Sequence, residues 1–184
     1  MAIALSKKSG KGRVHGVASE LSAFFTIKPG HAEELRAALE RFQARAQPGD
    51  KSVFERLGLR TQRHVIFDHG RRVMWSTAFE SDWDPYIDDA IQIFGHKSWV
   101  DWLQHTEEYT GGFENSTNTE VKAFLQSGQE QAVTFFDALS NYTLPQIKKA
   151  LQLAQAFQQV LDDPAAAQAL QHPALKPLLE QAAD

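Results

Sequence analysis

Residues 59–80 read LRTQRHVIFDHGRRVMWSTAFE, and this stretch predicts a β-hairpin. Two runs rich in β-branched and aromatic residues, 59–67 and 72–80, flank the short sequence Asp68-His69-Gly70-Arg71. Runs of this kind are typical of strands, and Gly70 supplies the positive φ that a tight chain reversal needs. The stretch therefore indicates two antiparallel strands joined by a short turn.

The register of this hairpin predicts which side chains share a face. Closure around His69-Gly70 places Phe67 opposite Arg72, His64 opposite Trp75 and Gln62 opposite Thr77, and opposed residues share a face. One face then carries Arg60, Gln62, His64, Ile66, Val73, Trp75, Thr77 and Phe79, and the other carries Arg63, Val65, Phe67, Met74, Ser76 and Ala78. The second set includes small residues that let a helix approach, so we expect it to pack against helices. We expect the first set, which is aromatic with interspersed polar groups, to line a ligand cleft. A slip of one residue would exchange the two faces.

Alternation and helical periodicity outside the hairpin complete the predicted fold. Strands are expected at 18–28 and 131–139, and helices between Pro29-Gly30 and Pro48-Gly49 and at 82–95, 97–109, 120–126 and 144–161. This order predicts an α+β fold: a ferredoxin-like split βαβ antiparallel sheet with helices on one face, plus a C-terminal helical extension. A sheet of this kind leaves its other face for water, an extra segment or a second subunit.

The chain is expected to divide into three parts. Residues 1–16 contain Lys7, Lys8, Lys11 and Arg13 with no acidic residue, and interspersed glycines indicate a flexible basic tail. Residues 17–161 are predicted to form the ferredoxin-like α+β domain, with a helical insertion at about 96–128. Residues 162–184 are predicted to form a C-terminal helical extension.

Composition excludes several classes of protein. The 184 residues carry a net charge of −4, which gives no bulk attraction to nucleic acid. Cysteine is absent, so disulfides and thiolate chemistry are excluded. No apolar run approaches the roughly 18 residues of a membrane span, and residues 1–5 are too short for the core of a secretory signal. We therefore predict a cytoplasmic protein with neither membrane nor nucleic acid as its partner.

Three segments resemble a known superfamily. Residues 21–39, LSAFFTIKPGHAEELRAAL, resemble the first β-α unit of the dimeric α/β-barrel superfamily of ferredoxin-like proteins. Residues 63–68 and 78–89 resemble its hairpin and second helix, in a little-characterised bacterial branch. The resemblance covers about residues 18–160 and implies a homodimer formed through the open sheet faces, with a pocket between sheet and helices. The superfamily includes small monooxygenases, haem-handling enzymes, dye-decolourising peroxidases and modules without known catalysis. None of their catalytic motifs is present, so no functional residue is carried over.

His64 is the candidate catalytic residue. A histidine opposite a tryptophan on an apolar sheet face has the chemistry of a proton-transfer group or of a metal or haem ligand. The alternative is a buried structural imidazole in a dimer interface. The candidate ligand-binding residues are Phe24, Gln62, His64, Trp75 and Thr77, with Phe24 reaching the cleft from the first strand.

Two sets of potential metal ligands have simpler explanations. Asp101, His105 and Glu108 fall at i, i+4 and i+7 of the predicted helix 97–109, but the two-histidine zincin pattern is missing, and a solvated helix face explains them. The acidic cluster Asp82, Asp84, Asp88 and Asp89 starts a helix, where carboxylates interact favourably with the helix dipole. No metal site is predicted.

These observations favour a homodimer that binds a small, largely apolar organic molecule. An enzymatic version is a cofactor-light oxidoreductase or monooxygenase, with His64 as the proton shuttle and Trp75 and Phe24 as the pocket wall. The first alternative is a non-catalytic oligomerisation or interaction module, in which the aromatic face is a subunit seam and the C-terminal helices dock a partner. The second alternative is a haem-binding protein, with His64 as the ligand.

Overall fold

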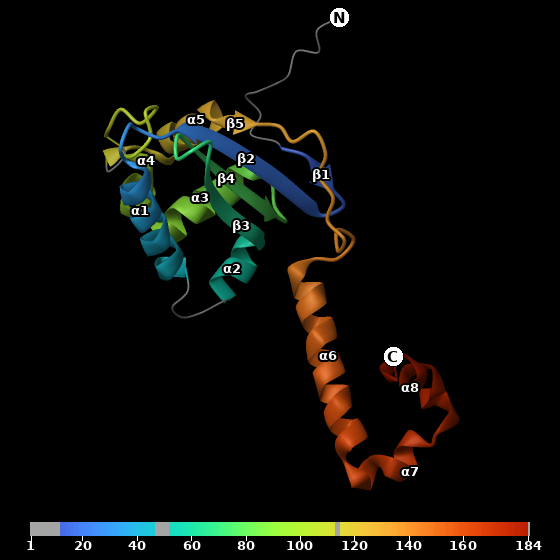
Figure 1. Ribbon diagram of the computed structural model, residues 1–184. Coiled ribbons are helices and arrows are strands. Elements are labelled where there is room, and N and C mark those ends of the chain that lie inside the picture. The colour runs from blue at the N-terminus through green and yellow to red at the C-terminus, as the bar shows by residue number, and fades with distance from the viewer. Residues whose placement is uncertain (1–11, 47–51, 113–114, 184) are drawn as a thin grey trace, which may run out of the picture. The chain divides into compact units, whose positions relative to one another are not determined.

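The computed structural model describes residues 12–46, 52–112 and 115–183 of the chain. The fold is α+β, with an antiparallel sheet, helices packed on one of its faces and further helices at the C-terminus (Figure 1). The chain divides into two compact units, Met1–Thr143 and Leu144–Asp184. The sequence analysis placed the end of the α+β domain at residue 161, whereas this division falls at the start of the long C-terminal helix.

The described residues form a five-stranded sheet. Its strands are β1 (Val14–His15), β2 (Ala18–Thr26), β3 (Leu59–Phe67), β4 (Arg72–Phe79) and β5 (Gln129–Glu130). The order is β1-β2-β4-β3, all pairs are antiparallel, and β5 also pairs with β2. Because β4 occupies one edge of β2, β1 and β5 share the other edge. The last strand therefore lies beside the first long one, as in the predicted ferredoxin-like arrangement. Of the segment predicted to be a flexible tail, 1–16, residues Val14–His15 form β1 and pair with β2, and residues 1–11 lie outside the described part.

The predicted hairpin and its register are confirmed. Phe67 pairs with Arg72, His64 with Trp75 and Gln62 with Thr77, and an irregularity between Leu59 and Thr61 shifts the register at the start of β3. The turn is tight: Asp68, His69 and Gly70 all have positive φ, at 53°, 56° and 79°. Aspartate, histidine and glycine tolerate this left-handed region better than most residues do.

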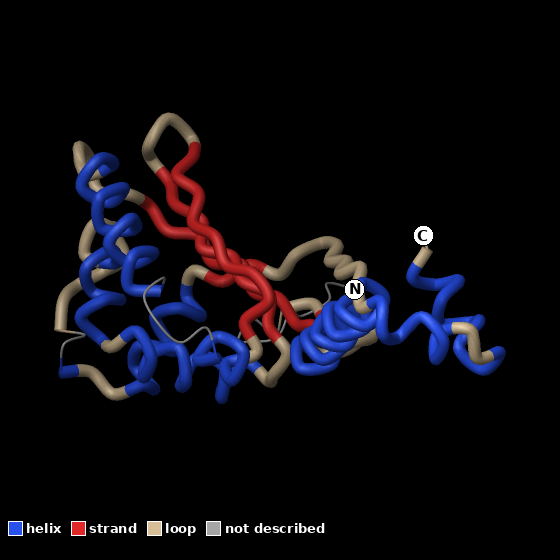
Figure 2. The backbone as a smooth tube through the Cα atoms, turned by 90° about the horizontal axis from the view of Figure 1, so that it is seen from below, coloured by secondary structure: helices blue, strands red, loops and turns tan. Residues whose placement is uncertain are grey.

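In the described part of the first unit the α-helices are α1 (Ala32–Ala46), α2 (Ser52–Leu57), α3 (Trp83–Phe94), α4 (His96–Leu103) and α5 (Asn118–Ser127). Helix α2 has no counterpart among the helices predicted from the sequence. A capping box starts α5, in which the Thr117 hydroxyl accepts from the Glu120 N–H and the Glu120 carboxylate accepts from the Thr117 N–H. Figure 2 shows the strands in red with these helices gathered on one side.

The face assigned to the helices by sequence is the wrong one. The helix-covered face carries the large side chains Leu21, Phe25, Val73, Trp75, Thr77 and Phe79, each at most 2% exposed. Arg63, Val65, Phe67, Met74 and Ser76 lie on the open face instead. The physical reason is area: burying Trp75 and Phe79 removes far more apolar surface from water than burying Ser76 and Ala78. The helices accommodate these rings by bringing Trp99 and Trp102 of α4 into the layer between helix and sheet.

The predicted strand at 131–139 is also wrong. Only β5 pairs with the sheet there, and the loop that follows leaves Val133 85% and Phe136 82% exposed. This loop is held in place by hydrogen bonds that do not belong to strand pairing. Arg60, whose side chain is 6% exposed, forms salt bridges with Glu80 and Asp137 and donates to the backbone carbonyls of residues 139 and 142. The Val17 N–H donates to the Ser140 carbonyl at 2.8 Å.

The second unit is entirely helical. It contains α6 (Leu144–Asp162), η2 (Pro164–Ala166), α7 (Ala167–Leu170), η3 (Pro173–Leu175) and α8 (Lys176–Ala182), which confirms the predicted C-terminal helices. None of the described residues in these helices is buried. No helix in the described part of the chain combines the length and apolar character needed to cross a membrane.

Candidate functional site

His64 lies inside the helix-covered layer. Its ring contacts Phe42 of α1 and Trp102 of α4, with centroid distances of 5.6 and 5.2 Å in edge-on geometry. Burial lowers the pKa of His64 to about 4, because a charged imidazolium would lose its hydration there. At neutral pH the imidazole is therefore uncharged. Its Nε2 atom is buried and has no hydrogen-bond partner.

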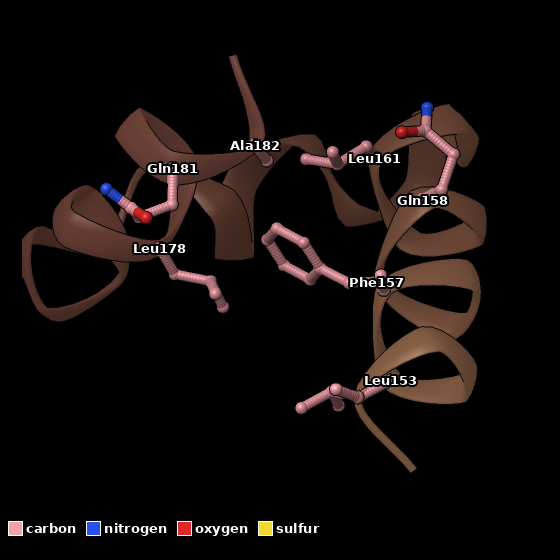
Figure 3. A pocket seen from close by; sticks show the side chains of 9 residues that line it. Leu153, Phe157, Gln158, Leu161, Leu178, Gln181 and Ala182 are labelled. Atoms are coloured by element: carbon pink, nitrogen blue, oxygen red, sulfur yellow. The ribbon is translucent and has the colours of Figure 1, made fainter. Parts of the chain in front are cut away.

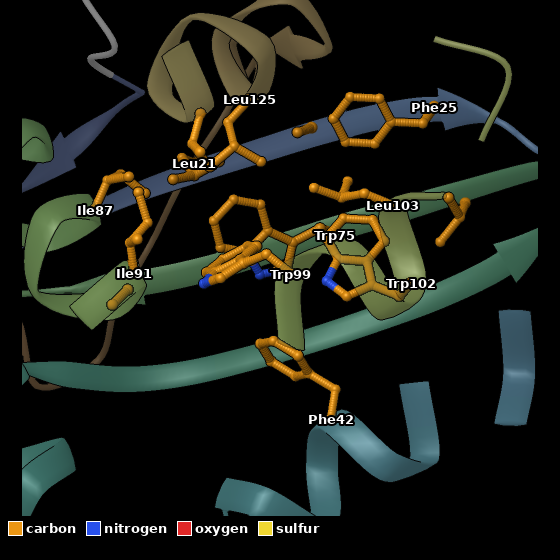
Figure 4. Close-up of a cluster of buried hydrophobic side chains, with 14 of the residues drawn as sticks. Leu21, Phe25, Phe42, Trp75, Ile87, Ile91, Trp99, Trp102, Leu103 and Leu125 are labelled. Atoms are coloured by element: carbon orange, nitrogen blue, oxygen red, sulfur yellow. The ribbon is translucent and has the colours of Figure 1, made fainter. Parts of the chain in front are cut away.

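Trp102, which contacts His64, belongs to a cluster of three tryptophans. Trp75 contacts Trp99 at 5.1 Å between centroids, and Trp99 contacts Trp102 at 6.1 Å (Figure 4). Their three indole nitrogens are buried and have no partner among the described residues. Buried polar atoms in proteins are nearly always hydrogen-bonded, and an unpaired one costs about 1–3 kcal/mol. The imidazole of His64 and the indoles of Trp75, Trp99 and Trp102 therefore have unused hydrogen-bonding capacity.

A pocket of about 230 Å³ opens at the start of β3, and we call it the Gln62 pocket. Its lining comes from β3 and three helices: Gln43, Phe54, Leu59, Arg60, Thr61, Gln62 and Phe94. The Phe54 and Phe94 rings stand 6.2 Å apart. Phe94 also stacks on Phe42 at 4.6 Å, and Phe42 is the ring that contacts His64. A continuous series of rings thus connects the pocket wall to the buried histidine.

The structure separates the five predicted ligand-binding residues. Gln62 lines the pocket, and His64 and Trp75 lie on the same sheet face behind it. Thr77 is on that face too, but its hydroxyl is bound to Tyr86 Oη at 2.6 Å and to the Thr61 carbonyl at 3.0 Å. Burial raises the pKa of Tyr86, so that hydrogen bond is between neutral groups.

Phe24 is on the opposite face, contrary to prediction. It pairs with Met74, meets Phe67 edge-on at 6.3 Å, and has the Arg72 guanidinium 5.8 Å from its ring centroid. Because side chains alternate along a strand, the burial of Phe25 against Phe124 and Trp102 directs Phe24 away from the helices. Phe24 and Trp75 therefore cannot form one pocket wall.

His64 does not fit haem ligation in this structure. Iron binding requires an imidazole nitrogen with an open side, and the buried Nε2 of His64 has aromatic rings packed around its imidazole. The Gln62 pocket does not include His64 in its lining.

A second pocket lies at the other end of the helix-covered layer. It has a volume of about 490 Å³ and is lined by Lys28, His31, Gln104, His105, Tyr109, Thr110 and Gly111. The Nδ1 atoms of His31 and His105 are 3.1 Å apart. Burial and the nearby charge of His31 lower the pKa of His105. His31 is absent from the predicted site residues, because no local sequence pattern connects two residues separated by 74 positions.

The Asp101, His105 and Glu108 set is not brought together. The helix ends at Leu103, so the expected i, i+4 and i+7 geometry does not form. Asp101 accepts two hydrogen bonds from Arg41, and Glu108 accepts the Thr26 N–H at 2.9 Å. The described residues contain no group of three or more histidines and carboxylates placed to hold a metal ion.

Two of the acidic residues of α3, Asp84 and Asp88, pair with a lysine. Lys122 of α5 places its Nζ 2.6 Å from Asp88 and 3.2 Å from Asp84. The hydrogen bond from Lys122 lowers the pKa of Asp88. These contacts join α5 to α3.

The C-terminal unit contains an apolar hollow of about 430 Å³ (Figure 3). Leu153, Phe157 and Leu161 of α6 face Leu178 and Ala182 of α8 across it. It contains no titratable side chain, so it offers apolar contact and no catalytic group.

Comparisons with known proteins give a limited likeness. No protein-family model matches the sequence, and no curated protein matches it. Among solved structures, tetracenomycin F2 cyclase from Streptomyces glaucescens, described as a type-II polyketide cyclase, has a similar arrangement. The TM-score is 0.40 at 14% identity, and the match covers 65% of this chain and 97% of the cyclase chain. At that level the likeness carries no information about function.

Proposed function

We propose that this protein binds a small, largely apolar organic molecule in the Gln62 pocket. The two phenyl rings of Phe54 and Phe94 offer flat apolar contact, and the side-chain amides of Gln43 and Gln62 offer hydrogen bonds. Ligand sites typically combine an apolar wall with a few polar groups that fix orientation. A volume of about 230 Å³ suits a molecule of one or two rings.

The observation that carries the proposal is the set of unused polar atoms behind the pocket. His64 Nε2 and the indole nitrogens of Trp75, Trp99 and Trp102 are buried and unpartnered, and the ring series of Phe94 and Phe42 leads to them. Unpaired buried polar atoms lower the stability of a folded chain. Where they occur, the site commonly serves a purpose other than stability. A ligand group or a water molecule that reaches them would satisfy hydrogen bonds that the chain itself leaves unmade.

The same geometry favours binding over proton transfer. A general base is most effective when its pKa lies near the working pH, and burial holds the pKa of His64 at about 4. The oxidoreductase version of the proposal would therefore need a ligand that raises this pKa toward neutrality. Binding alone needs no such change.

A titration of ¹⁵N-labelled protein with millimolar 2-naphthol tests the proposal. This probe has two fused rings and one hydroxyl, which match the rings and amides of the pocket. We expect the side-chain amide of Gln62 and the indole N–H signals of Trp99 and Trp102 to shift, while the signal of Trp83, which has no ring contact with that series, stays in place. Unchanged Gln62 and indole signals at millimolar probe would contradict the proposal.

A matched pair of variants locates the binding site. Gln62→Phe fills the pocket with an aromatic ring and should abolish the shifts caused by 2-naphthol. Gln92→Phe makes the same change on the exposed surface of α3 and should preserve them. Equal binding by both variants would place the probe elsewhere.

We also propose that a second copy of this chain covers the open sheet face. Phe24 and Phe67 lie on it only partly buried, and Val65 beside them is 40% exposed. The Arg72 guanidinium lies 5.4 Å from the Phe67 centroid, so the face also presents a cation beside aromatic rings. Such a half-buried face on an antiparallel sheet is an ordinary site of subunit contact.

The mass of the protein in solution tests this second proposal. Sedimentation of the wild-type protein at micromolar concentration should give twice the 20.6 kDa chain mass. Val65→Glu should shift the equilibrium toward the monomer, because it places a charge in the contact. Val133→Glu, an equal change in the exposed 131–143 loop, should not. A monomeric wild type, or a Val65→Glu variant that remains dimeric, would overturn the proposal.

A further inference from the structure

His31 and His105 form a pair of nitrogen donors outside the proposed ligand pocket. His31 directly precedes α1, His105 follows α4, and both are partly buried at the wall of the 490 Å³ pocket. Their Nδ1 atoms face each other at 3.1 Å and their ring centroids are 5.4 Å apart. Without another group between them, these two nitrogens share a single hydrogen.

We propose that this pair binds a divalent transition-metal ion, with Zn²⁺ as the representative case. Imidazole nitrogens bind Zn²⁺ at about 2.0–2.1 Å, so two of them in tetrahedral geometry stand about 3.3–3.4 Å apart. The observed separation of 3.1 Å is close to that value. An ion can therefore replace the shared hydrogen after the rings spread by a few tenths of an ångström.

The backbone holds both histidines in position before any ion binds. The His31 N–H donates to the Lys28 carbonyl at 3.0 Å, and the His31 carbonyl accepts from Leu35 at 2.9 Å. The His105 N–H donates to Trp102 at 3.2 Å, and its carbonyl accepts the Lys28 N–H at 2.9 Å. Lys28 thus connects the two segments directly. Donors fixed in this way lose little conformational freedom on binding.

Charges of both signs lie near the pair: Glu34 and Asp101 favour positive charge on His105, and Arg41 opposes it. Lys28 is the cationic side chain in the pocket lining, and its Nζ is bound to the Gln104 carbonyl at 2.8 Å. Arg41 is engaged by the Asp101 carboxylate at 2.8 Å. Glu34, three residues after His31 in the first turn of α1, lies near enough to act electrostatically on His105.

The proposed site has two ready donors and an open side. Water or a small anion can complete the coordination from the pocket. Two imidazole donors suit Zn²⁺, Ni²⁺ and Cu²⁺ rather than Mg²⁺ or Ca²⁺. Because only two donors are in place, we expect micromolar rather than tighter affinity for Zn²⁺.

Calorimetric titration of tag-free protein with ZnCl₂ tests the site. The wild type should bind one equivalent, and His31→Ala and His105→Ala should each weaken binding by more than about tenfold, the loss seen even for residues that only orient a ligand. His69→Asn is the control, because it removes an exposed turn histidine and asparagine tolerates the positive φ there. Absence of a one-equivalent site in the wild type would overturn the proposal, as would unchanged affinity in either alanine variant.

A measurement on the wild-type protein tests the site even if the alanine variants fail to fold. In ¹⁵N spectra of the imidazole rings, Zn²⁺ should move the Nδ1 signals of His31 and His105 together and leave those of His64 and His172 unchanged. A Zn²⁺-induced shift confined to other histidines would contradict the proposal. Neither outcome depends on whether the Gln62 pocket binds 2-naphthol, because the two sites share no lining residue.

Discussion

Acidification from pH 7 to about pH 4 should lower the free energy of unfolding by about 3 kcal/mol through His64 alone. Burial lowers the pKa of this imidazole in the folded state to about 4 from an ordinary value of 6.5. Between those two pH values the unfolded chain binds a proton that the folded chain does not. Stability therefore rises with pH across this window. The contribution is fully present above pH 6.5 and is lost as the pH falls toward 4.

The pH dependence is best measured as a difference between variants. Urea denaturation at a series of pH values gives the free energy of unfolding for the wild type and for His64→Leu, and subtraction cancels the titration of the carboxylates. The wild type should lose about 3 kcal/mol relative to His64→Leu over the window. His69→Asn should follow the wild type, since that histidine is exposed. Parallel curves for the wild type and His64→Leu would show that His64 titrates normally and is not buried.

Replacing Trp102 with alanine should cost about 3–5 kcal/mol of unfolding free energy, the usual range for removing a buried tryptophan. Trp102 is 0% exposed and contacts Phe25, His64 and Trp99. Its loss would leave a cavity at the centre of the layer between α4 and the sheet. Chemical denaturation followed by circular dichroism measures the change without relying on tryptophan fluorescence.

Phe136→Ala is the matched control for this truncation. It also removes an aromatic ring, but that ring is 82% exposed, so the change should stay within about 0.5 kcal/mol. Trp102→Phe, which retains part of the apolar volume, should cost less than Trp102→Ala. Similar losses for Trp102→Ala and Phe136→Ala would mean that α4 does not pack its tryptophans against the sheet.

The hairpin was predictable because its information is local. The turn sequence Asp68-His69-Gly70 fixes the point of reversal, and strict alternation on both sides fixes which residues oppose each other. The choice of face was not predictable in the same way, because both faces carry apolar side chains. The choice of face depends on Trp99 and Trp102. These residues belong to a helix whose position the hairpin sequence does not indicate.

Two other differences arise from contacts between distant segments. The run Val133-Thr134-Phe135-Phe136 has the composition of a strand, but Arg60 and Val17 hold the loop that follows it by other hydrogen bonds. The helix expected to run to residue 109 ends at Leu103. There the Thr106 hydroxyl donates to the Leu103 carbonyl at 2.7 Å, and Lys28 Nζ donates to the carbonyl of residue 104. That ending turns His105 toward His31.

The candidate site was predictable only where its residues follow from the local pattern of the hairpin. Gln62, His64 and Trp75 share a face because of the register, which the sequence determines. The pocket beside Gln62 depends on Phe54 of α2 and Phe94 of α3, and neither residue has a local signal for ligand contact. Phe24 was assigned to the wrong side because its own strand offers aromatic residues on both faces.

The central claim is that the ligand site lies on the helix-covered side of the sheet, at Gln62, and not on the open side at Phe24. A crystal structure of the protein soaked with 2-naphthol tests it most directly. We predict that the probe lies between Phe54 and Phe94, with its hydroxyl at the amide of Gln62 or Gln43. Probe density over Phe24 and Phe67, with the Gln62 pocket unfilled, would contradict the account.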